Sequence, residues 1–357
     1  MKIFFVGDFK NDTGPGIANK LLRKGLGSSR SYLYSEGHGR IGRVFEIIWK
    51  TLRSDCVCMC SASRSNALVI RAARLLHKPA YYVMHGYQTF EQKRNNPQIS
   101  GQKLQQIHHS EAFIFKHVNK VFCVSKKFME YMKQAEPEYA DKFDYHYNGV
   151  DLEQIEQGIS ASQSAEPARD QNDQHKNHRD KNPRQIVSIG GGMPQKNNLT
   201  VCRSIDQLNR EKSMALSYIV IGLPYTDKEE ICSYEFVRYY DHLPHERVLE
   251  ILAESGLYIQ NSSFETFGLA VVEALLADCS LLLSEQIGMT DLLGTLQEGD
   301  RIANTDDPAE IAEKIERLIK EGNAGRLKAG LETKEIGYRQ AASGLVDKIT
   351  AAQVSSR

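Results

Sequence analysis

Short apolar runs alternate with segments of helical periodicity along most of the chain. In its first part, the runs that predict buried strands are Lys2–Val6, Ser31–Tyr34, Cys56–Cys60, Ala80–Met84 and Val121–Val124. Between them, apolar residues recur every three or four positions, as in Ile41–Arg53, which is typical of a helix. Strands that alternate with helices predict a parallel sheet covered by helices.

This pattern is interrupted at residues 153–184, where Gln, Asp, Asn, Ser, Lys and His dominate and large apolar residues are scarce. Such a composition buries too little apolar surface to offset the entropy lost on ordering, so we expect a polar linker or mobile loop. A second series follows, with strands predicted at 185–189, 218–222, 236–239, 256–260 and 280–284. The sequence therefore predicts two doubly wound, Rossmann-like α/β domains, over 1–152 and 185–337.

Length and composition fit two globular domains. The chain has 357 residues, of which 41% are hydrophobic, and this excludes a wholly disordered protein. No apolar run approaches the roughly 18–20 residues of a membrane-spanning helix. The first residues, MKIFFVGDFK, have too short an apolar stretch for a signal peptide, so we expect none. Seven cysteines without such a signal favour the reducing cytoplasm.

The zero net charge conceals an asymmetry between the two parts of the chain. Residues 1–150 hold 23 Lys and Arg against 12 Asp and Glu, whereas residues 151–357 hold 22 against 33. A basic domain attracts phosphates, which points to nucleic acid, an anionic membrane surface or a phosphorylated ligand; equally, opposite charges help two domains to close on each other. The stacking platforms and fold signatures of nucleic-acid-binding modules are missing, so we expect no nucleic-acid partner.

The segment Asn261–Leu275 carries two carboxylates eight positions apart. A helix predicted over Phe267–Ala277 leaves Glu265 in the preceding loop and Glu273 about two turns along, roughly 12 Å away at ~1.5 Å per residue. That distance suits the two ends of a nucleotide-sugar. The amides at the helix start, with the helix dipole, can hold an anion. Because the helix around Glu273 is otherwise apolar, its carboxylate needs a polar partner.

This segment, E-T-F-G-L-A-V-V-E-A-L, resembles the Glu-x7-Glu motif of the retaining glycosyltransferases of family 4, which have the two-domain GT-B fold. Other blocks occur in the family's order, namely a Gly-rich loop after the first strand, His85-Gly86, Val124-Ser125, Asn148-Gly149-Val150-Asp151 and Pro194-Gln195-Lys196. The resemblance covers nearly the whole chain. It implies two Rossmann-like domains facing a cleft, and a C-terminal helix, at about 338–357, that packs back on the N-terminal domain.

The resemblance also assigns roles to individual residues. Three are implied in catalysis: Lys196 matches the lysine that binds the donor diphosphate, Glu265 a group that holds the transferred sugar, and His85 the histidine near the reactive face of that sugar. The further donor-binding positions are Glu273, which matches the ribose-binding glutamate, the sugar-binding segment Thr266, Phe267, Gly268 and Leu269, and the glycine loop with Gly14 and Gly16.

The chain departs from the family pattern at three places. The family usually has an Arg five residues before the lysine, and that position here is Gly191. Asp278 stands in place of the usual Gly after the Glu-x7-Glu helix, and the family's Gly-Gly donor loop reads Ile287-Gly288-Met289-Thr290.

The resemblance implies a glycosyltransferase that moves a sugar from a UDP- or GDP-sugar to a hydroxyl of a glycan or lipid-linked acceptor, as in cell-surface polysaccharide synthesis. No Asp-x-Asp signature occurs, so we expect no obligatory metal or cofactor. A basic stretch between Lys10 and Arg53 is either a contact to anionic lipid on the inner face of the membrane or a solvated helix face.

Other functions stay open at this stage. A nucleotide-sugar 2-epimerase or phosphorylase of the same fold would share these motifs, and so would an inactive scaffold. A nicotinamide-dependent oxidoreductase is a remote alternative, because Gly14-Pro15-Gly16 follows a strand; its fingerprint fails, since Asn19 occupies the position of the third glycine.

Overall fold

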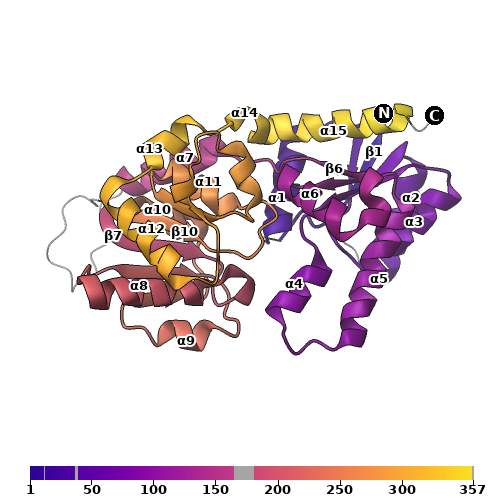
Figure 1. Ribbon diagram of the computed structural model, residues 1–357. Helices are drawn as coiled ribbons and strands as arrows, with labels where there is room; N and C mark the ends of the chain where they lie inside the picture. Colours follow the sequence, from indigo (N-terminus) through magenta and orange to yellow (C-terminus); the bar gives the residue numbers. More distant parts are fainter. Residues whose placement is uncertain (12, 37–38, 165–180, 356–357) are drawn as a thin grey trace. The chain divides into compact units, whose positions relative to one another are not determined.

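The computed structural model describes residues 1–11, 13–36, 39–164 and 181–355 of the chain (Figure 1). The chain forms two compact units. The N-terminal unit combines Met1–Asp151 with Thr333–Arg357, and the C-terminal unit is the continuous segment Leu152–Glu332. In the described part of the chain, no helix is long and apolar enough to cross a membrane.

The N-terminal unit is built on a six-stranded sheet in the order β2-β1-β3-β4-β5-β6, and every neighbouring pair is parallel. Its strands are short, and those in the middle of the sheet are almost wholly buried, as expected for a sheet with helices on both faces. They are β1 (Ile3–Val6), β2 (Tyr32–Tyr34), β3 (Cys56–Met59), β4 (Ala80–Met84), β5 (Lys120–Cys123) and β6 (Phe143–Tyr145).

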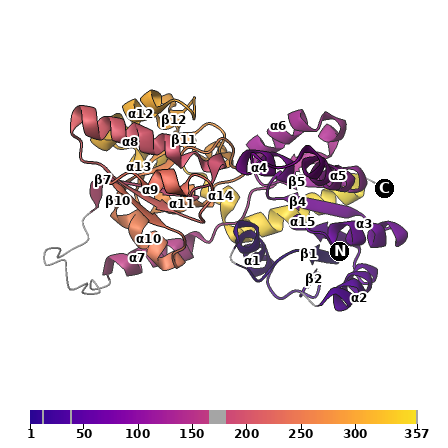
Figure 2. The same ribbon diagram turned by 90° about the horizontal axis from the view of Figure 1, so that it is seen from below.

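Helices connect these strands and cover the sheet (Figure 2). Three begin at a hydroxyl side chain that accepts a hydrogen bond from the first turn, at Thr13, Ser100 and Ser125. The helices of the unit are α1 (Gly14–Leu26), α2 (Arg40–Leu52), α3 (Asn66–Leu75), α4 (Gln88–Asn95), α5 (Gly101–His117), α6 (Lys126–Ala135), the 3₁₀ helix η1 (Pro137–Lys142), α14 (Thr333–Ile336) and α15 (Tyr338–Ser355).

Helix α15 closes the N-terminal unit although it is distant in sequence from the rest of the unit. It packs so tightly on α1 that a Cβ added at Gly25 would lie 2.6 Å from the Cβ of Ala342. The segment before α15 is held as well, because Val150 and Gly337 form a parallel β-bridge. The chain passes from one unit to the other twice, and this bridge pairs the backbone close to both passages.

The C-terminal unit contains a second parallel six-stranded sheet, in the order β12-β11-β10-β7-β8-β9. Because β7 connects to β8 on one side and has β10 on the other, the strand order reverses between β7 and β10. Ligands of open α/β sheets bind at such a reversal, beyond the carboxyl ends of the strands. The strands are β7 (Asn182–Ile189), β8 (Ser217–Ile221), β9 (Val237–Tyr240), β10 (Ser255–Gln260), β11 (Ser280–Ser284) and β12 (Arg301–Ile302).

The helices of this unit pack on a core of aliphatic side chains that includes Ile186, Ile205, Leu257, Leu282 and Ile311. They are α7 (Leu152–Ser164), η2 (Pro194–Lys196), α8 (Asn198–Lys212), α9 (Lys228–Cys232), α10 (His245–Glu254), α11 (Leu269–Leu276), η3 (Gly288–Leu292), η4 (Glu298–Asp300), α12 (Pro308–Glu321) and α13 (Ala324–Ala329).

The prediction of a polar linker from residue 153 onwards is wrong for the first part of that segment. Helix α7 occupies it and belongs to the C-terminal unit. Ile155 and Ile159, four residues apart, are buried and give α7 its inner face, while Gly158 allows a close approach to Leu249 of α10. The last residues of the segment begin β7. The remainder of the predicted linker, 165–180, lies outside the described residues.

A buried ionic cluster ties the outer strands of the C-terminal unit to α13. Asp300 is wholly buried, and its carboxylate accepts hydrogen bonds from Nδ2 of Asn323 at 2.8 Å, Nη2 of Arg326 at 2.8 Å and the amide of Gln297 at 2.8 Å. Burial by itself would raise the pKa of Asp300, but these bonds and the Arg326 charge outweigh it, and they hold that pKa below its ordinary value.

Candidate functional site

The strand reversal of the C-terminal unit brings two predicted site residues together. Lys196 ends the short helix η2 that follows β7, and Glu265 lies in the loop that follows β10. Their ammonium and carboxylate groups form an ion pair in which both side chains are largely shielded, with exposed fractions of 17% and 18%. The carboxylate also accepts a hydrogen bond from Nε2 of Gln260, at the end of β10, at 3.0 Å. A cation and an anion are thus fixed at the carboxyl edge of the sheet.

The backbone around this pair is held by further hydrogen bonds. The Gln195 carbonyl accepts from the amide of Ser263 at 2.9 Å, and the Gln195 side chain donates to the carbonyl of Phe264 at 2.7 Å. These bonds join the loop after β7 to the loop after β10. Gly190 leaves room for the lysine stem, because a Cβ at that position would lie 2.5 Å from Cγ of Lys196. The ion pair is therefore preorganised by its surroundings.

The start of α11 differs from the prediction by two residues. The helix begins at Leu269, after Gly268 in a left-handed conformation with φ +98°, so Thr266 and Phe267 precede it rather than opening it. The loop before it is fixed on both sides of Glu265, whose amide donates to Gln286 and whose carbonyl accepts from Gly288. The first amides of any helix lack partners within the helix, so the end of α11 next to this loop presents hydrogen-bond donors.

Glu273 has the polar partner that its apolar helix requires. Its Oε1 lies 2.9 Å from Nε2 of His245, the first residue of α10, and this hydrogen bond raises the pKa of His245 above its ordinary value. Burial raises the pKa of Tyr258 well above its usual range, and the charges of Glu265 and Glu273 raise it further. Glu273 of α11 and His245 of α10 therefore form a second polar pair in this unit.

The predicted glycines of the N-terminal unit lie in the first turn of α1. A side chain at Gly16 would collide with the backbone, since its Cβ would lie 2.2 Å from the carbonyl oxygen of Asn11. At Gly14 the space is open, with no atom within 4 Å of an added Cβ. The backbone at the start of α1 is thus accessible at Gly14, whereas Gly16 is required by the turn itself.

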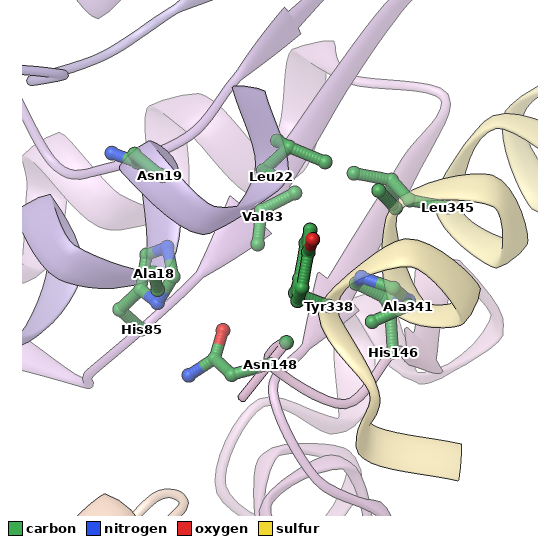
Figure 3. Close-up of a pocket in the computed structure, with 12 residues that line it drawn as sticks. Ala18, Asn19, Leu22, Val83, His85, His146, Asn148, Tyr338, Ala341 and Leu345 are labelled. Atoms are coloured by element: carbon green, nitrogen blue, oxygen red, sulfur yellow. The ribbon is translucent and has the colours of Figure 1, made fainter. Parts of the chain in front are cut away.

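His85 follows β4 in the N-terminal unit and lines a small cavity of about 20 Å³, room for about one water molecule. Figure 3 shows that α1, α15 and the end of β4 enclose it, with Tyr338 reaching from α15 towards Leu22 and Val83. Burial lowers the pKa of His85 to about 4. Its imidazole is therefore neutral at physiological pH, and it can exchange hydrogen bonds but supplies no positive charge.

Gly191 occupies the position at which the resembling family usually has an Arg, and its geometry leaves no room for a side chain. It has φ +62°, and an added Cβ would lie 2.3 Å from the carbonyl oxygen of Leu223. The turn Gly190–Gly192 is also held by the Tyr239 hydroxyl, which accepts a hydrogen bond from the amide of Gly192 at 2.7 Å. No cation can be supplied from this position without rebuilding the turn.

Gly191→Arg is therefore expected to lower the free energy of unfolding by at least about 2 kcal/mol rather than to add a phosphate-binding cation. The measurement is urea denaturation of the variant and of the parent protein. Gly325→Arg is the matched control, because a Cβ at Gly325 meets no atom within 4 Å. Equal stability of Gly191→Arg and the parent would contradict the steric argument.

Two polar residues of this site were not predicted from the sequence. Gln260 supports Glu265, and His245 is bonded to Glu273. The only sequence signal for Gln260 is a polar residue at the end of an otherwise apolar strand, and His245 carries none beyond its place at a helix start. Among the predicted residues, the structure joins Lys196 with Glu265 directly, whereas Glu273 is bonded to His245.

Comparison with solved structures gives matches over the full length of the chain at low sequence identity. HepE from Anabaena, crystallised with UDP and glucose, is 14% identical and has a TM-score of 0.66 over 98% of this chain and 99% of that chain. Sucrose-phosphate synthase from Thermosynechococcus elongatus is 13% identical, with a TM-score of 0.67 over 99% and 100% of the two chains. The UDP-forming α,α-trehalose-phosphate synthase from Burkholderia xenovorans, crystallised with glucose-6-phosphate, is 9% identical, with a TM-score of 0.68 over 98% and 100%.

No curated protein matches the chain in sequence. The structural likeness confirms the predicted GT-B fold of two Rossmann-like domains, each with its own parallel sheet. The C-terminal unit with its Lys196–Glu265 pair falls almost entirely within a segment recognised by a family model: residues 169–334, a little under half of the chain, match the glycosyl transferases group 1.

Proposed function

We propose that the chain is a retaining glycosyltransferase, which moves a sugar from a UDP- or GDP-sugar to a hydroxyl of a glycan or lipid-linked acceptor. The observation that carries the proposal is the Lys196–Glu265–Gln260 cluster at the strand reversal, within the segment that matches the glycosyl transferases group 1. A fixed cation at the carboxyl edge of a parallel sheet is suited to the diphosphate of such a donor.

In the proposed reaction the bond between the anomeric carbon and the diphosphate oxygen breaks, and a bond to the acceptor oxygen forms on the same face of the sugar. The transition state has oxocarbenium character. The proton of the acceptor hydroxyl passes to a donor phosphate oxygen, so no protein nucleophile is needed. Lys196 and the first amides of α11 stabilise the negative charge that develops on the leaving nucleoside diphosphate.

The other residues bind and orient in this mechanism. Glu265, with its carboxylate fixed by Lys196 and Gln260, accepts hydrogen bonds from hydroxyls of the transferred sugar. Glu273 holds the ribose hydroxyls. His85, neutral at physiological pH because burial lowers its pKa, hydrogen-bonds to a sugar hydroxyl. The proposal includes no metal ion, and it includes a role in cell-surface polysaccharide synthesis at the cytoplasmic face of a membrane.

A donor hydrolysis screen tests the proposal. The protein is incubated with nucleotide-sugars in the presence of a chelator, and the released nucleoside diphosphate is measured. UDP-glucose is the first donor to test, since a solved structure of similar fold is a complex with UDP-glucose. Release of UDP or GDP together with the unchanged sugar supports the proposal. Release with an altered sugar would instead indicate an epimerase, and binding without turnover would indicate an inactive scaffold.

Glu273→Gln is expected to raise the donor KM by roughly tenfold to a hundredfold, because hydrogen bonds to a charged group contribute about 1.5–3 kcal/mol. The value of kcat should change less, since the ribose is remote from the breaking bond. Steady-state kinetics with varied donor give both constants. The matched control is Glu321→Gln, which alters an exposed carboxylate of α12. An unchanged donor KM would remove Glu273 from the donor site.

A further inference from the structure

The outer surface of helix α2 is apolar and exposed to solvent. Its apolar residues recur at intervals of three and four, which places them along one side of the helix. Their exposed fractions are 76% for Ile41, 39% for Val44, 70% for Phe45, 46% for Ile48, 52% for Trp49 and 59% for Leu52. We call these six residues the α2 face. Apolar surface gathered in this way on one helix marks an interaction site more often than a scatter of single residues does.

The opposite side of α2 fixes the helix in this orientation. Ile47 and Thr51 are wholly buried against the unit. The carboxylate of Glu46 accepts from Nζ of Lys50 at 2.8 Å, and the same ammonium group donates to the carbonyl of Tyr34 at 2.7 Å. Turning the α2 face inward would break these hydrogen bonds and expose Ile47 to solvent, so the apolar side stays outside. Figures 1 and 2 show α2 beside α3 at the edge of the N-terminal unit.

The surroundings of the α2 face are strongly basic. Residues 30–78 carry nine Lys and Arg against three Asp and Glu. Of the acidic residues, Glu46 is engaged by Arg43 and Lys50, and Asp55 accepts from the amide of Lys2. The third, Glu36, is 62% exposed and lies 3.8 Å from Nζ of Lys50. The Arg53 guanidinium lies over the ring of Trp49, at 4.7 Å from its centroid. The face therefore combines an apolar stripe with cations at its border.

We propose that the α2 face inserts into the interfacial region of an anionic lipid bilayer, with α2 lying in the plane of the membrane. A helix with an apolar side and a cationic border binds at this depth, and a Trp at its margin fits the boundary between headgroups and acyl chains. The basic charge around the α2 face argues against a second copy of the chain as its partner, because two such surfaces repel each other. The inference rests on the proposed function, which places the enzyme at the cytoplasmic face of a membrane, and it deepens that function by naming the surface that contacts the lipid.

Trp49 is the only tryptophan of the chain, so its fluorescence reports on this face without labelling. The purified protein is mixed with vesicles of phosphatidylcholine alone, or of phosphatidylcholine with phosphatidylglycerol. We expect the emission to shift to the blue, and brominated acyl chains to quench it, with the anionic vesicles only. Sedimentation should show that the protein travels with the same vesicles, and high salt should weaken this binding.

The double variant Ile41→Gln/Phe45→Gln should reduce vesicle partitioning at least about tenfold, since each exposed side chain would otherwise bury much of its apolar area in the bilayer. Val354→Gln, which alters a residue with an exposed fraction of 71% on α15, should partition like the parent protein. Donor hydrolysis without vesicles should be the same in all three proteins, which separates this test from that of the proposed function.

Three results would overturn the proposal. They are an unchanged Trp49 emission with anionic vesicles, equal partitioning of the double variant and the parent, and protection of Trp49 from an aqueous quencher by self-association without lipid. Circular dichroism of the double variant checks that its helix content is retained, so that a loss of partitioning is assigned to the α2 face.

Discussion

Lys196→Ala is expected to lower kcat for sugar transfer by roughly 10²- to 10³-fold, the range found when one preorganised donor to a developing anion is removed. The ammonium group of Lys196 is held by Glu265 in a largely shielded position. In such surroundings a charge acts more strongly than it does in water. The interaction grows as the diphosphate departs, so the loss should fall mainly on kcat and less on the donor KM.

The matched control for this variant is Lys212→Ala, at the end of α8, which removes a half-exposed ammonium paired with Glu316. It should transfer sugar at the parent rate. Lys196→Arg should recover only part of the activity, because a guanidinium presents its donors in a planar fork rather than as a point charge. Full activity of Lys196→Ala would contradict the proposed site, whatever the kinetics of Glu273→Gln show.

Asp300→Ala is expected to cost about 3–5 kcal/mol of the free energy of unfolding, the range for breaking a buried charge cluster by removing one partner. The buried donor on Asn323 would be left without its acceptor, and Arg326, whose side chain is 31% exposed, would lose its ion pair. Urea denaturation measures the loss. Asp241→Ala, which removes a half-exposed carboxylate paired with Lys228, is the control, with an expected cost under about 1 kcal/mol.

The same cluster predicts how stability changes with acid. Since the pKa of Asp300 is lower in the folded protein than its ordinary value, the unfolded chain takes up its proton first as the pH falls. The stabilisation is therefore complete above a pH of about 4, the ordinary pKa of an Asp, and it is lost as the pH falls through the lower folded pKa. Asp300→Ala should show a shallower decline in this range than the parent. Parallel curves for the two proteins would contradict the assignment.

Most of the sheet architecture follows from local sequence pattern. The apolar runs at Ala80–Met84 and Ser280–Ser284 coincide with β4 and β11. These segments are bounded by residues that end regular structure and are long enough for one period to dominate. At α7 the polar composition predicts a linker, which is wrong. Ile155 and Ile159 provide enough apolar surface there for a helix among many polar residues.

The candidate site is less predictable, because its contacts join residues distant in sequence. Lys196 and Glu265 are 69 positions apart, and the pairing of their strands brings them together. A lone histidine such as His245 gives no sign in the sequence that it will meet Glu273, since the contact depends on how α10 packs against α11. The pattern within Ile41–Arg53 predicts an amphipathic helix, but it cannot tell that the apolar side faces outward, which depends on the buried partners of Glu46 and Lys50.

The return of the chain to the N-terminal unit sets an order for folding during synthesis. The C-terminal unit is one uninterrupted segment, so it can form as soon as it has left the ribosome. The first unit to be made must wait longer, because the close contact of Gly25 with Ala342 requires α15, which is translated after the whole of the other unit. Until then, the side of α1 that α15 will cover is an exposed apolar surface. A ribosome stalled near residue 332 should therefore hold a nascent chain whose N-terminal unit recruits chaperones.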